Sequence, residues 1–170
     1  MEYRTAPRSR CRLTVPPMTT MTPMRMVDVT GKERTVRAAI ARGFVSTTTD
    51  VVDMINSGSA TKGDVLAAAR LAAIMAVKRT PDLVPLCHPI AIGGVEVEIN
   101  ASSSTVQLEV MVKTADRTGV EMEALTAVCA AGLTVIDMIK GTDPAASIES
   151  VRVMAKTGGK TGDWQRSDDR

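Results

Sequence analysis

The sequence contains few aromatic residues, with only Tyr3, Phe44 and Trp164 among 170 residues. Proteins that bind single-stranded nucleic acid stack the bases on aromatic side chains, and this chain has almost none to offer. It also lacks an excess of one charge, because 21 Lys and Arg residues are balanced by 19 Asp and Glu residues. General polyanion binders carry a concentrated basic excess. We therefore expect no nucleic-acid partner, and a core built from Val, Ile, Leu, Ala and the eleven Met residues.

Cysteine is also scarce. Cys11, Cys87 and Cys129 are widely spaced, odd in number and without a CxxC pair. This pattern argues against a disulfide framework or a zinc site, and it fits a reducing compartment. No run approaches the 18 apolar residues of a membrane span, and the Arg-rich start lacks the continuous apolar segment of a secretory signal. We expect a cytoplasmic protein with no membrane partner.

The length of the chain suits one compact domain with a hydrophobic core. Residues 1–25 differ from the rest, because Arg alternates there with Pro and Thr without any period. We interpret them as a disordered leader, explained either by an over-called start site or by an Arg-rich transit peptide. Residues 26–164 are the expected folded domain, and residues 165–170 are expected to form a flexible C-terminal tail.

Hydrophobic periodicity predicts both strands and helices in this domain. Thr61 is expected to cap a helix that Pro81 ends, and apolar alternation on either side of residues 100–104 predicts a hairpin. The expected elements are a strand at 44–47, helices at 49–55 and 61–77, strands at 95–99 and 106–112, a helix at about 119–140 and a strand at 151–155. Their order is that of a ferredoxin-like α+β sandwich, with an antiparallel sheet and helices on one face.

The second long helix carries charged groups on an element otherwise built of small apolar residues. Asp137 and Lys140 are three residues apart, so they share one helix face and can pair or bind a common ligand. An ordinary surface ion pair has the same spacing. Small and polar residues form a line on that face: Glu123, Thr126, Ala130, Thr134 and Asp137. Since a solvated face would be richer in long charged side chains, this line favours a functional site.

Glu123 and Asp137 cannot both reach one small ligand from the same helix. They are fourteen residues apart, which corresponds to roughly 21 Å along a continuous helix. Either the chain has two separate sites, or a second subunit brings its own helix end alongside and the site lies at a homo-oligomer interface. We favour the interface.

The only histidine, His88, lies between two prolines in the rigid segment 85–89. A lone histidine in a loop is either structural or, in such a setting, a general acid, general base or phosphate donor. Cys87 beside it does not indicate a metal, because adjacent residues rarely chelate one ion and no second Cys/His pair is available. We therefore expect no metal site.

Two lysine-containing segments are candidates for anion binding. Lys62 precedes a helix N-terminus, where backbone N–H groups and the helix dipole favour an anion, although a solvated helix start has the same pattern. The Gly-Lys run at 156–162 is not a Walker motif, because Met154 stands where the first Gly is required. A phosphate-binding nest and a flexible C-terminus are the two interpretations that we keep.

Eight short segments follow one another in a distinctive order. They are Met26-Val27-Asp28-Val29, Thr35-Val36-Arg37, Lys62-Gly63-Asp64-Val65, Lys78-Arg79-Thr80, Pro85-Leu86-Cys87-His88-Pro89, Gly119-Val120-Glu121-Met122-Glu123-Ala124-Leu125, Asp137-Met138-Ile139-Lys140 and Lys156-Thr157-Gly158-Gly159-Lys160-Thr161-Gly162. Over about residues 26–164 the chain thus closely resembles the MoaC family of molybdenum cofactor biosynthesis. It departs from common members at residues 116–118 and 141–144, outside the motif residues.

The resemblance implies a lyase that converts 3′,8-cyclo-7,8-dihydro-GTP into cyclic pyranopterin monophosphate and releases pyrophosphate. The substrate is the product of a radical-SAM GTP cyclase, which makes that enzyme an expected partner. No cofactor is implied, and assistance of the pyrophosphate by Mg²⁺ is left open. The resemblance also implies a homo-oligomer of ferredoxin-like subunits, a hexamer built as a trimer of dimers, with sites between subunits.

Carried onto this sequence, the resemblance implies that Asp137, Lys140 and Lys62 are catalytic. The substrate-binding residues that it implies are His88, Glu121, Met122, Glu123, Arg37, Lys156 and Cys87. Since the reaction rebuilds a purine-derived ring and closes a cyclic phosphate, it needs proton transfers and cations on the phosphates. We expect Lys140 beside Asp137 to act as an acid–base pair, with a desolvated lysine. The triphosphate would be held by Lys62, Arg37, His88 and Lys156.

Two other classes of protein compete with this interpretation. A ferredoxin-like RNA-binding module would need aromatic residues on its sheet, and the predicted strands at 95–99 and 106–112 contain none. A catalytically silent oligomer that binds a phosphorylated metabolite would keep Lys62, Arg37 and the Gly-Lys run. It would have no use for Asp137 beside Lys140, so alanine variants at these two positions separate a binder from a catalyst.

Overall fold

The computed structural model describes residues 23–160 and 162–167. Most of the expected leader, at 1–22, and the end of the expected tail, at 168–170, lie outside the described residues. Five strands and four helices occur in the described part. The strands are β1 (Thr35–Ser46), β2 (Ile92–Ser102), β3 (Thr105–Asp116), β4 (Ser147–Thr157) and β5 (Trp164–Gln165). The helices are α1 (Thr49–Asn56), α2 (Val65–Val77), α3 (Thr80–Leu83) and α4 (Glu121–Ile139).

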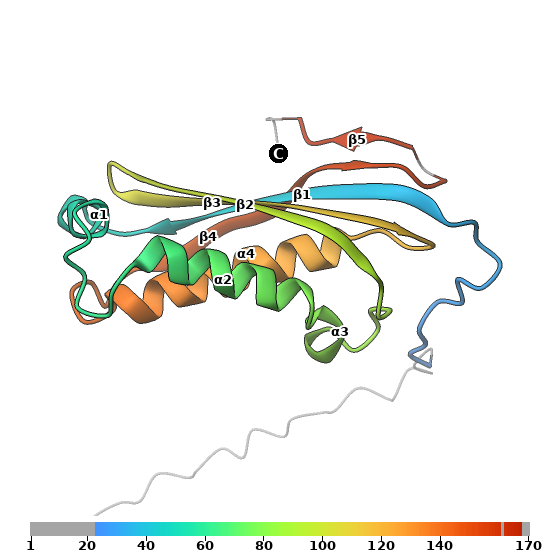
Figure 1. The fold of residues 1–170 in the computed structure, drawn as a ribbon, viewed down its shortest axis with the longest axis horizontal. Helices are drawn as coiled ribbons and strands as arrows, with labels where there is room; N and C mark the ends of the chain where they lie inside the picture. The colour runs from blue at the N-terminus through green and yellow to red at the C-terminus, as the bar shows by residue number, and fades with distance from the viewer. Residues whose placement is uncertain (1–22, 161, 168–170) are drawn as a thin grey trace, which may run out of the picture.

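The strands form one antiparallel sheet in the order β2-β3-β1-β4-β5. Helices α2 and α4 lie side by side on one face of it (Figure 1). The α+β class, the antiparallel sheet and the placement of the long helices on one face are therefore confirmed. Because consecutive side chains alternate between the two faces of a strand, only every second residue of each strand can meet these helices.

The core lies between the sheet and the two long helices. Valine and leucine residues on alternate positions of β3, such as Leu108 and Val110, are fully buried there. Small residues let α4 approach the sheet closely: a Cβ on Gly43 would lie 2.8 Å from Cγ1 of Val128. Because the core contains few aromatic side chains, the helix and strand backbones can come close together.

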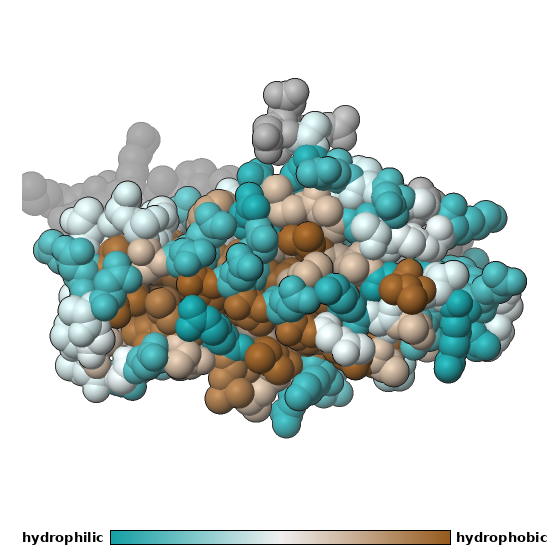
Figure 2. Space-filling view, turned by 45° about the horizontal axis from the view of Figure 1, so that its top comes forward, coloured by the Kyte–Doolittle hydropathy of each residue, from teal (hydrophilic) through white to brown (hydrophobic). Residues whose placement is uncertain are grey.

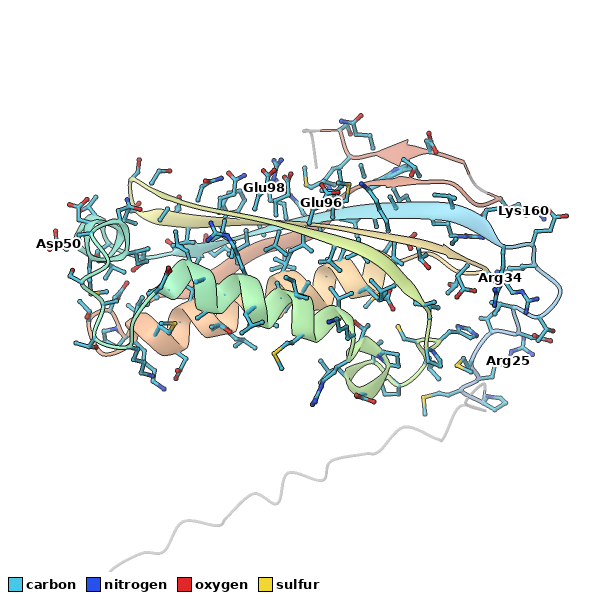
Figure 3. The ribbon with its side chains drawn as sticks, viewed as in Figure 1. Arg25, Arg34, Asp50, Glu96, Glu98 and Lys160 are labelled. Atoms are coloured by element: carbon cyan, nitrogen blue, oxygen red, sulfur yellow. The ribbon has the colours of Figure 1, made fainter. Side chains whose placement is uncertain are left out.

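The opposite face of the sheet has no long helix on it. Arg42 donates from Nε to Glu109 at 2.7 Å, and Lys113 pairs with Glu96 at 2.8 Å. Figure 2, which turns this face toward the viewer, shows hydrophobic surface interspersed with polar side chains. Glu96 and Glu98 point away from the helices (Figure 3). The charged alternation along β2 and β3 therefore belongs to this open face, as the predicted hairpin requires.

Two local predictions need correction. The cap of α2 is Asp64 and not Thr61, because the side chain of Asp64 accepts a hydrogen bond from the Ala67 N–H at 2.9 Å. Gly63, at φ +97°, reverses the chain just before that cap. The strand predicted at 44–47 is also much longer than expected, since β1 begins at Thr35. Its polar residues Arg37 and Arg42 hid the alternation, although both find partners on or beside β3.

A short edge strand, β5, was not predicted. It pairs with β4, and the Arg166 N–H donates to the carbonyl of Met154 at 2.7 Å. Gln165 of β5 and Arg166 come from the segment expected to be a flexible tail. Hydrogen bonds to the edge of β4 therefore hold the first part of that segment.

Helix α4, with its 19 residues, is long and apolar enough to cross a membrane by length and composition alone. Half of its apolar window is buried inside the described part of the protein, against β1, β3, β4 and α2. The same apolar composition is needed for a helix in the core of a domain. Its packing on the sheet accounts for the hydropathy of α4.

Candidate active site

The C-terminal end of α4 holds the three residues that the resemblance marks as catalytic. Lys62, in the loop before α2, donates from Nζ to Oδ2 and to the main-chain oxygen of Asp137, each at 2.8 Å. Lys140 donates from Nζ to Oδ1 of the same aspartate at 2.7 Å. One carboxylate therefore lies between two ammonium groups. We call Lys62, Asp137 and Lys140 the lysine–aspartate cluster.

The two lysines stabilise the charged form of the aspartate. Their hydrogen bonds and positive charges, first from Lys140 and then from Lys62, lower the pKa of Asp137 to about 2. The carboxylate is consequently ionised throughout the physiological pH range. In this state it accepts hydrogen bonds and orients both ammonium groups, and it is not a proton donor.

The lysine–aspartate cluster is open to solvent in the single chain. The side chain of Lys140 is 60% exposed, and that of Asp137 is 55% exposed. A lysine that transfers protons at neutral pH usually needs a desolvated setting. This chain alone does not provide one, so the cluster would have to be covered by substrate or by another subunit.

The N-terminal end of α4 is organised differently. Glu121, in the first turn, pairs with Nζ of Lys156 on β4 at 3.2 Å, and both side chains are about one-third exposed. Arg37 on β1 donates from Nε to the Asp116 carbonyl at 3.0 Å, which anchors its guanidinium at the end of β3. Strand pairing of β1 with β4 thus brings Arg37 and Lys156 to the same end of the sheet.

Three cavities at this end are linked by the residues that line them. The largest, about 740 Å³, is lined by Arg37 and by six residues from the segments at 31–35 and 159–160. Arg37 also lines a small cavity beside Glu121 and Lys156, and these two line a third cavity of about 290 Å³ with Trp164. We call these three cavities together the basic groove.

The basic groove contains one functional candidate that sequence reasoning missed, Lys32, beside Lys160 of the Gly-Lys run. Figure 3 shows Arg34 and Lys160 at the same end of the sheet. Thr35, which also lines the groove, has a buried hydroxyl that finds no partner within the described residues. The sequence indicated Lys32 only through its position directly after Gly31. The same Gly-Lys pair occurs in the candidate anion-binding run at 156–162.

The Gly-Lys run itself turns through two glycines, Gly158 and Gly159, at φ +80° and +77°. Consecutive residues of this kind can direct N–H groups toward an anion. Here the Gly158 N–H already donates to Oδ1 of Asp163 at 3.0 Å. The turn is therefore held internally, and its contribution to the groove comes from the Lys160 side chain and from Gly159 beside Arg37.

The third group of candidates consists of Glu123, in the first turn of α4, and of Cys87 and His88, in the segment before β2. Glu123 is buried, and desolvation, together with the charge of Glu121, raises the pKa of its carboxyl. Burial, reinforced by Glu123, likewise raises the pKa of the Cys87 thiol. His88 is half-buried and acts electrostatically on Asp28. Glu123 therefore lies close enough to Cys87 to act on its charge, and His88 lies close enough to Asp28 to do the same.

The structure thus does not bring all the predicted site residues together in one place. Arg37, Glu121 and Lys156 line one cavity at the N-terminal end of α4. The exposed Met122 and the buried Glu123 belong to the same first turn, and Cys87 lies within electrostatic reach of Glu123. The lysine–aspartate cluster lies at the other end, and α4 runs unbroken between them. Lys62 does not join Arg37 and Lys156 within one chain. No group of three or more His, Cys, Asp or Glu side chains in the described residues is arranged to hold a metal ion.

Comparison with known proteins points to a single family. The model of the MoaC family matches residues 26–159. A cyclic pyranopterin monophosphate synthase of Streptomyces avermitilis is 55% identical over 84% of this chain and 84% of its own. The enzyme of the same name from Corynebacterium efficiens is 55% identical over 82% of this chain and 90% of its own.

A third relative, cyclic pyranopterin monophosphate synthase 2 of Mycobacterium bovis, is 51% identical over 83% of this chain and 84% of its own. Among solved structures, the de novo designed protein Foldit4 has 13% identity and a TM-score of 0.28, which is too low to support an inference. The family match and the similarity along most of both chains establish that this chain belongs to the MoaC family.

Proposed function

We propose that this chain catalyses the conversion of 3′,8-cyclo-7,8-dihydro-GTP into cyclic pyranopterin monophosphate and pyrophosphate. The observation that carries the proposal is the lysine–aspartate cluster, in which Asp137 accepts hydrogen bonds from Lys140 and Lys62. A protein that only binds a phosphorylated metabolite has no need for it. Relatives that cover most of the chain are named as synthases of this product.

Each end of α4 has a distinct role in this proposal. Lys140 exchanges protons with the reacting ring, Asp137 holds the Lys140 ammonium in place, and Lys62 fixes Asp137 from its other oxygen. The triphosphate is bound in the basic groove by Arg37, Lys156, Lys32 and Lys160. These cations attract phosphate because they face few acidic groups there. The buried carboxyl of Glu123 makes a hydrogen bond to the heterocycle.

The direct test is to incubate the purified protein with enzymatically generated 3′,8-cyclo-7,8-dihydro-GTP and to quantify product and pyrophosphate. We expect product from the wild type and very little from the Lys140→Ala and Lys62→Ala variants. Lys113→Ala is a matched control, because Lys113 is also an exposed lysine in an ion pair but lies on the open face of the sheet. Substrate binding without product by a well-folded wild type would favour the silent binder.

The site is proposed to lie between subunits of a homo-oligomer, a hexamer of ferredoxin-like chains. The sheet order agrees with a ferredoxin-like sandwich extended by β5. On α2 and α4, the side that faces away from the sheet leaves Leu71, Met75 and Leu133 at least half exposed. Apolar side chains at such density favour a protein interface. Leu133 lies one turn before Asp137, so a subunit seated on Leu133 would also cover the lysine–aspartate cluster.

The oligomer is testable by light scattering on the purified protein. We expect six chains per particle, and dissociation with loss of turnover in a variant that carries Leu133→Asp and Leu71→Asp. A monomeric wild type with full activity would contradict a site between subunits.

We further propose that the reaction needs no resident cofactor, that the substrate comes from a radical-SAM GTP cyclase, and that the protein works in the cytoplasm. Lysine and arginine side chains can neutralise a triphosphate without a metal. Activity should therefore survive treatment with a chelator. A complete loss that added Mg²⁺ restores would show that the metal takes part.

A further inference from the structure

Strand β5 contains only two residues, yet the chain is built to hold it in place. The segment before it turns through Gly158, Gly159 and Gly162, all at positive φ, where residues other than glycine are strained. Asp163 accepts the Gly158 N–H. On the far side, the Nε of Arg166 donates to the Val153 carbonyl at 2.8 Å. The chain is thus held in place both before and after β5, where it folds back along β4.

This return places Trp164 beside Lys156. The two residues are register partners in the antiparallel pair of β5 and β4, so their side chains lie on the same face of the sheet. That face is the one from which Lys156 reaches Glu121. Trp164, Lys156, Glu121 and Val153 line one cavity. The Arg166 guanidinium lies over the face of the indole ring, 5.5 Å from its centroid.

We propose that Trp164 is a positioning residue for substrate binding, which acts by keeping water from the Lys156–Glu121 pair and holding the Lys156 ammonium at the basic groove. Ion pairs in contact with bulk water are weak, because solvent screens the charges and the side chains stay mobile. A bulky aromatic side chain on one flank reduces both effects. The inference rests on the proposed function only in taking the substrate to be an anionic nucleotide.

The first test uses the fact that Trp164 is the only tryptophan of the chain. Intrinsic tryptophan fluorescence of the full-length protein is therefore a report from this one position. GTP and inorganic tripolyphosphate are the stable probes, and calorimetry measures their binding independently. We expect a saturable change in emission with both probes, and its loss in Lys156→Met. Binding detected by calorimetry without any change in emission would overturn the proposal.

The second test separates positioning from folding. Trp164→Ala should raise KM for the cyclic dihydro-GTP substrate by about fivefold and leave kcat within about twofold, since the proton-transferring cluster lies at the other end of α4. Trp164→Phe should restore most of the affinity. The matched control is Gln165→Ala, because Gln165 is exposed and, as its neighbour on β5, points to the opposite face.

These outcomes keep the inference separate from the proposed function. An unchanged KM in Trp164→Ala, with an active wild type, would overturn the positioning role and leave the synthase activity standing. If the alanine and phenylalanine variants both lost kcat and thermal stability to the same extent, Trp164 would be only a structural residue. An inactive wild type would overturn the synthase, whereas the fluorescence response to GTP would still test the link between Trp164 and Lys156.

Discussion

The two ends of α4 differ in how they hold their charged side chains. At the C-terminal end, Asp137 accepts hydrogen bonds from both Lys62 and Lys140. All three side chains are about half exposed. At the N-terminal end, Arg37 and Lys156 line hollows and are fixed at one side only, by Asp116 and Glu121. The first arrangement is suited to holding a lysine ammonium in place for proton exchange with a substrate, and the second to receiving an anion. Neither end alone contains what the proposed reaction needs.

The largest effect is expected at the C-terminal end. Lys140→Ala should lower kcat by about 10²- to 10⁴-fold, the usual range for loss of a general acid or base. KM should change by only about threefold, because the phosphate-binding cations lie at the other end. Steady-state kinetics with the cyclic dihydro-GTP substrate checks both values. A variant that lost substrate binding but kept its single-turnover rate would show that Lys140 is a binding residue.

A second prediction reverses this pattern at the N-terminal end. Lys156→Met should raise KM by about 10- to 100-fold, since a charge-assisted contact to phosphate contributes about 1.5–3 kcal/mol. Its effect on kcat should be much smaller than that of Lys140→Ala. The KM of the wild type should also rise with salt concentration, and that dependence should be weaker in the variant. Equal losses of kcat in both variants would remove the distinction between the two ends.

A third prediction concerns the turn that shapes the basic groove. A Cβ on Gly158 would overlap the carbonyl oxygen of Val36, and its φ of +80° is unfavourable for alanine. Gly158→Ala should therefore cost about 1–3 kcal/mol of stability and raise KM without a comparable loss of kcat. Gly94→Ala is the matched control, because a Cβ there meets no atom within 4 Å. Denaturant unfolding and kinetics measure the two effects.

The smallest effect is expected from the buried Glu123. Its pKa is raised in the folded protein, so the folded state loses stability relative to the unfolded chain as the pH rises above about 4.5. Glu123→Gln removes this loss. The variant should match the wild type near pH 4 and melt about 2–4 °C higher near pH 8. A melting-temperature difference that does not grow with pH would contradict the burial of an ionisable carboxyl.

The sequence predicts the parts of this fold that repeat a period. Apolar alternation located β3, and the 3.6-residue stripe located α4, because each element buries one face in the core. Strand β5 has no such pattern. It is held by hydrogen bonds of Arg166 to β4 and by glycine turns, which two residues of sequence cannot reveal. The cap at Asp64 was misplaced because Thr61 and Asp64 both carry capping side chains.

The candidate site was only partly readable from spacing. Asp137 and Lys140 are three residues apart on one helix, so their contact followed from helix geometry. The contact of Lys62 with Asp137 spans 75 residues and depends on how the loop before α2 lies against the end of α4. Lys32 and Lys160 meet Arg37 only through the pairing of β1 with its neighbours. Such groupings are properties of the packed sheet, and single segments do not encode them.

The most direct test of a site shared between the two ends of α4 is complementation between inactive variants. Lys140→Ala and Lys156→Met chains, co-expressed in equal amounts, assemble into mixed oligomers. If one subunit supplies the lysine–aspartate cluster and its neighbour the basic groove, random assembly leaves about a quarter of the sites intact. We predict that turnover returns to about a quarter of the wild-type rate. A mixture no more active than its better parent would contradict a site shared between subunits.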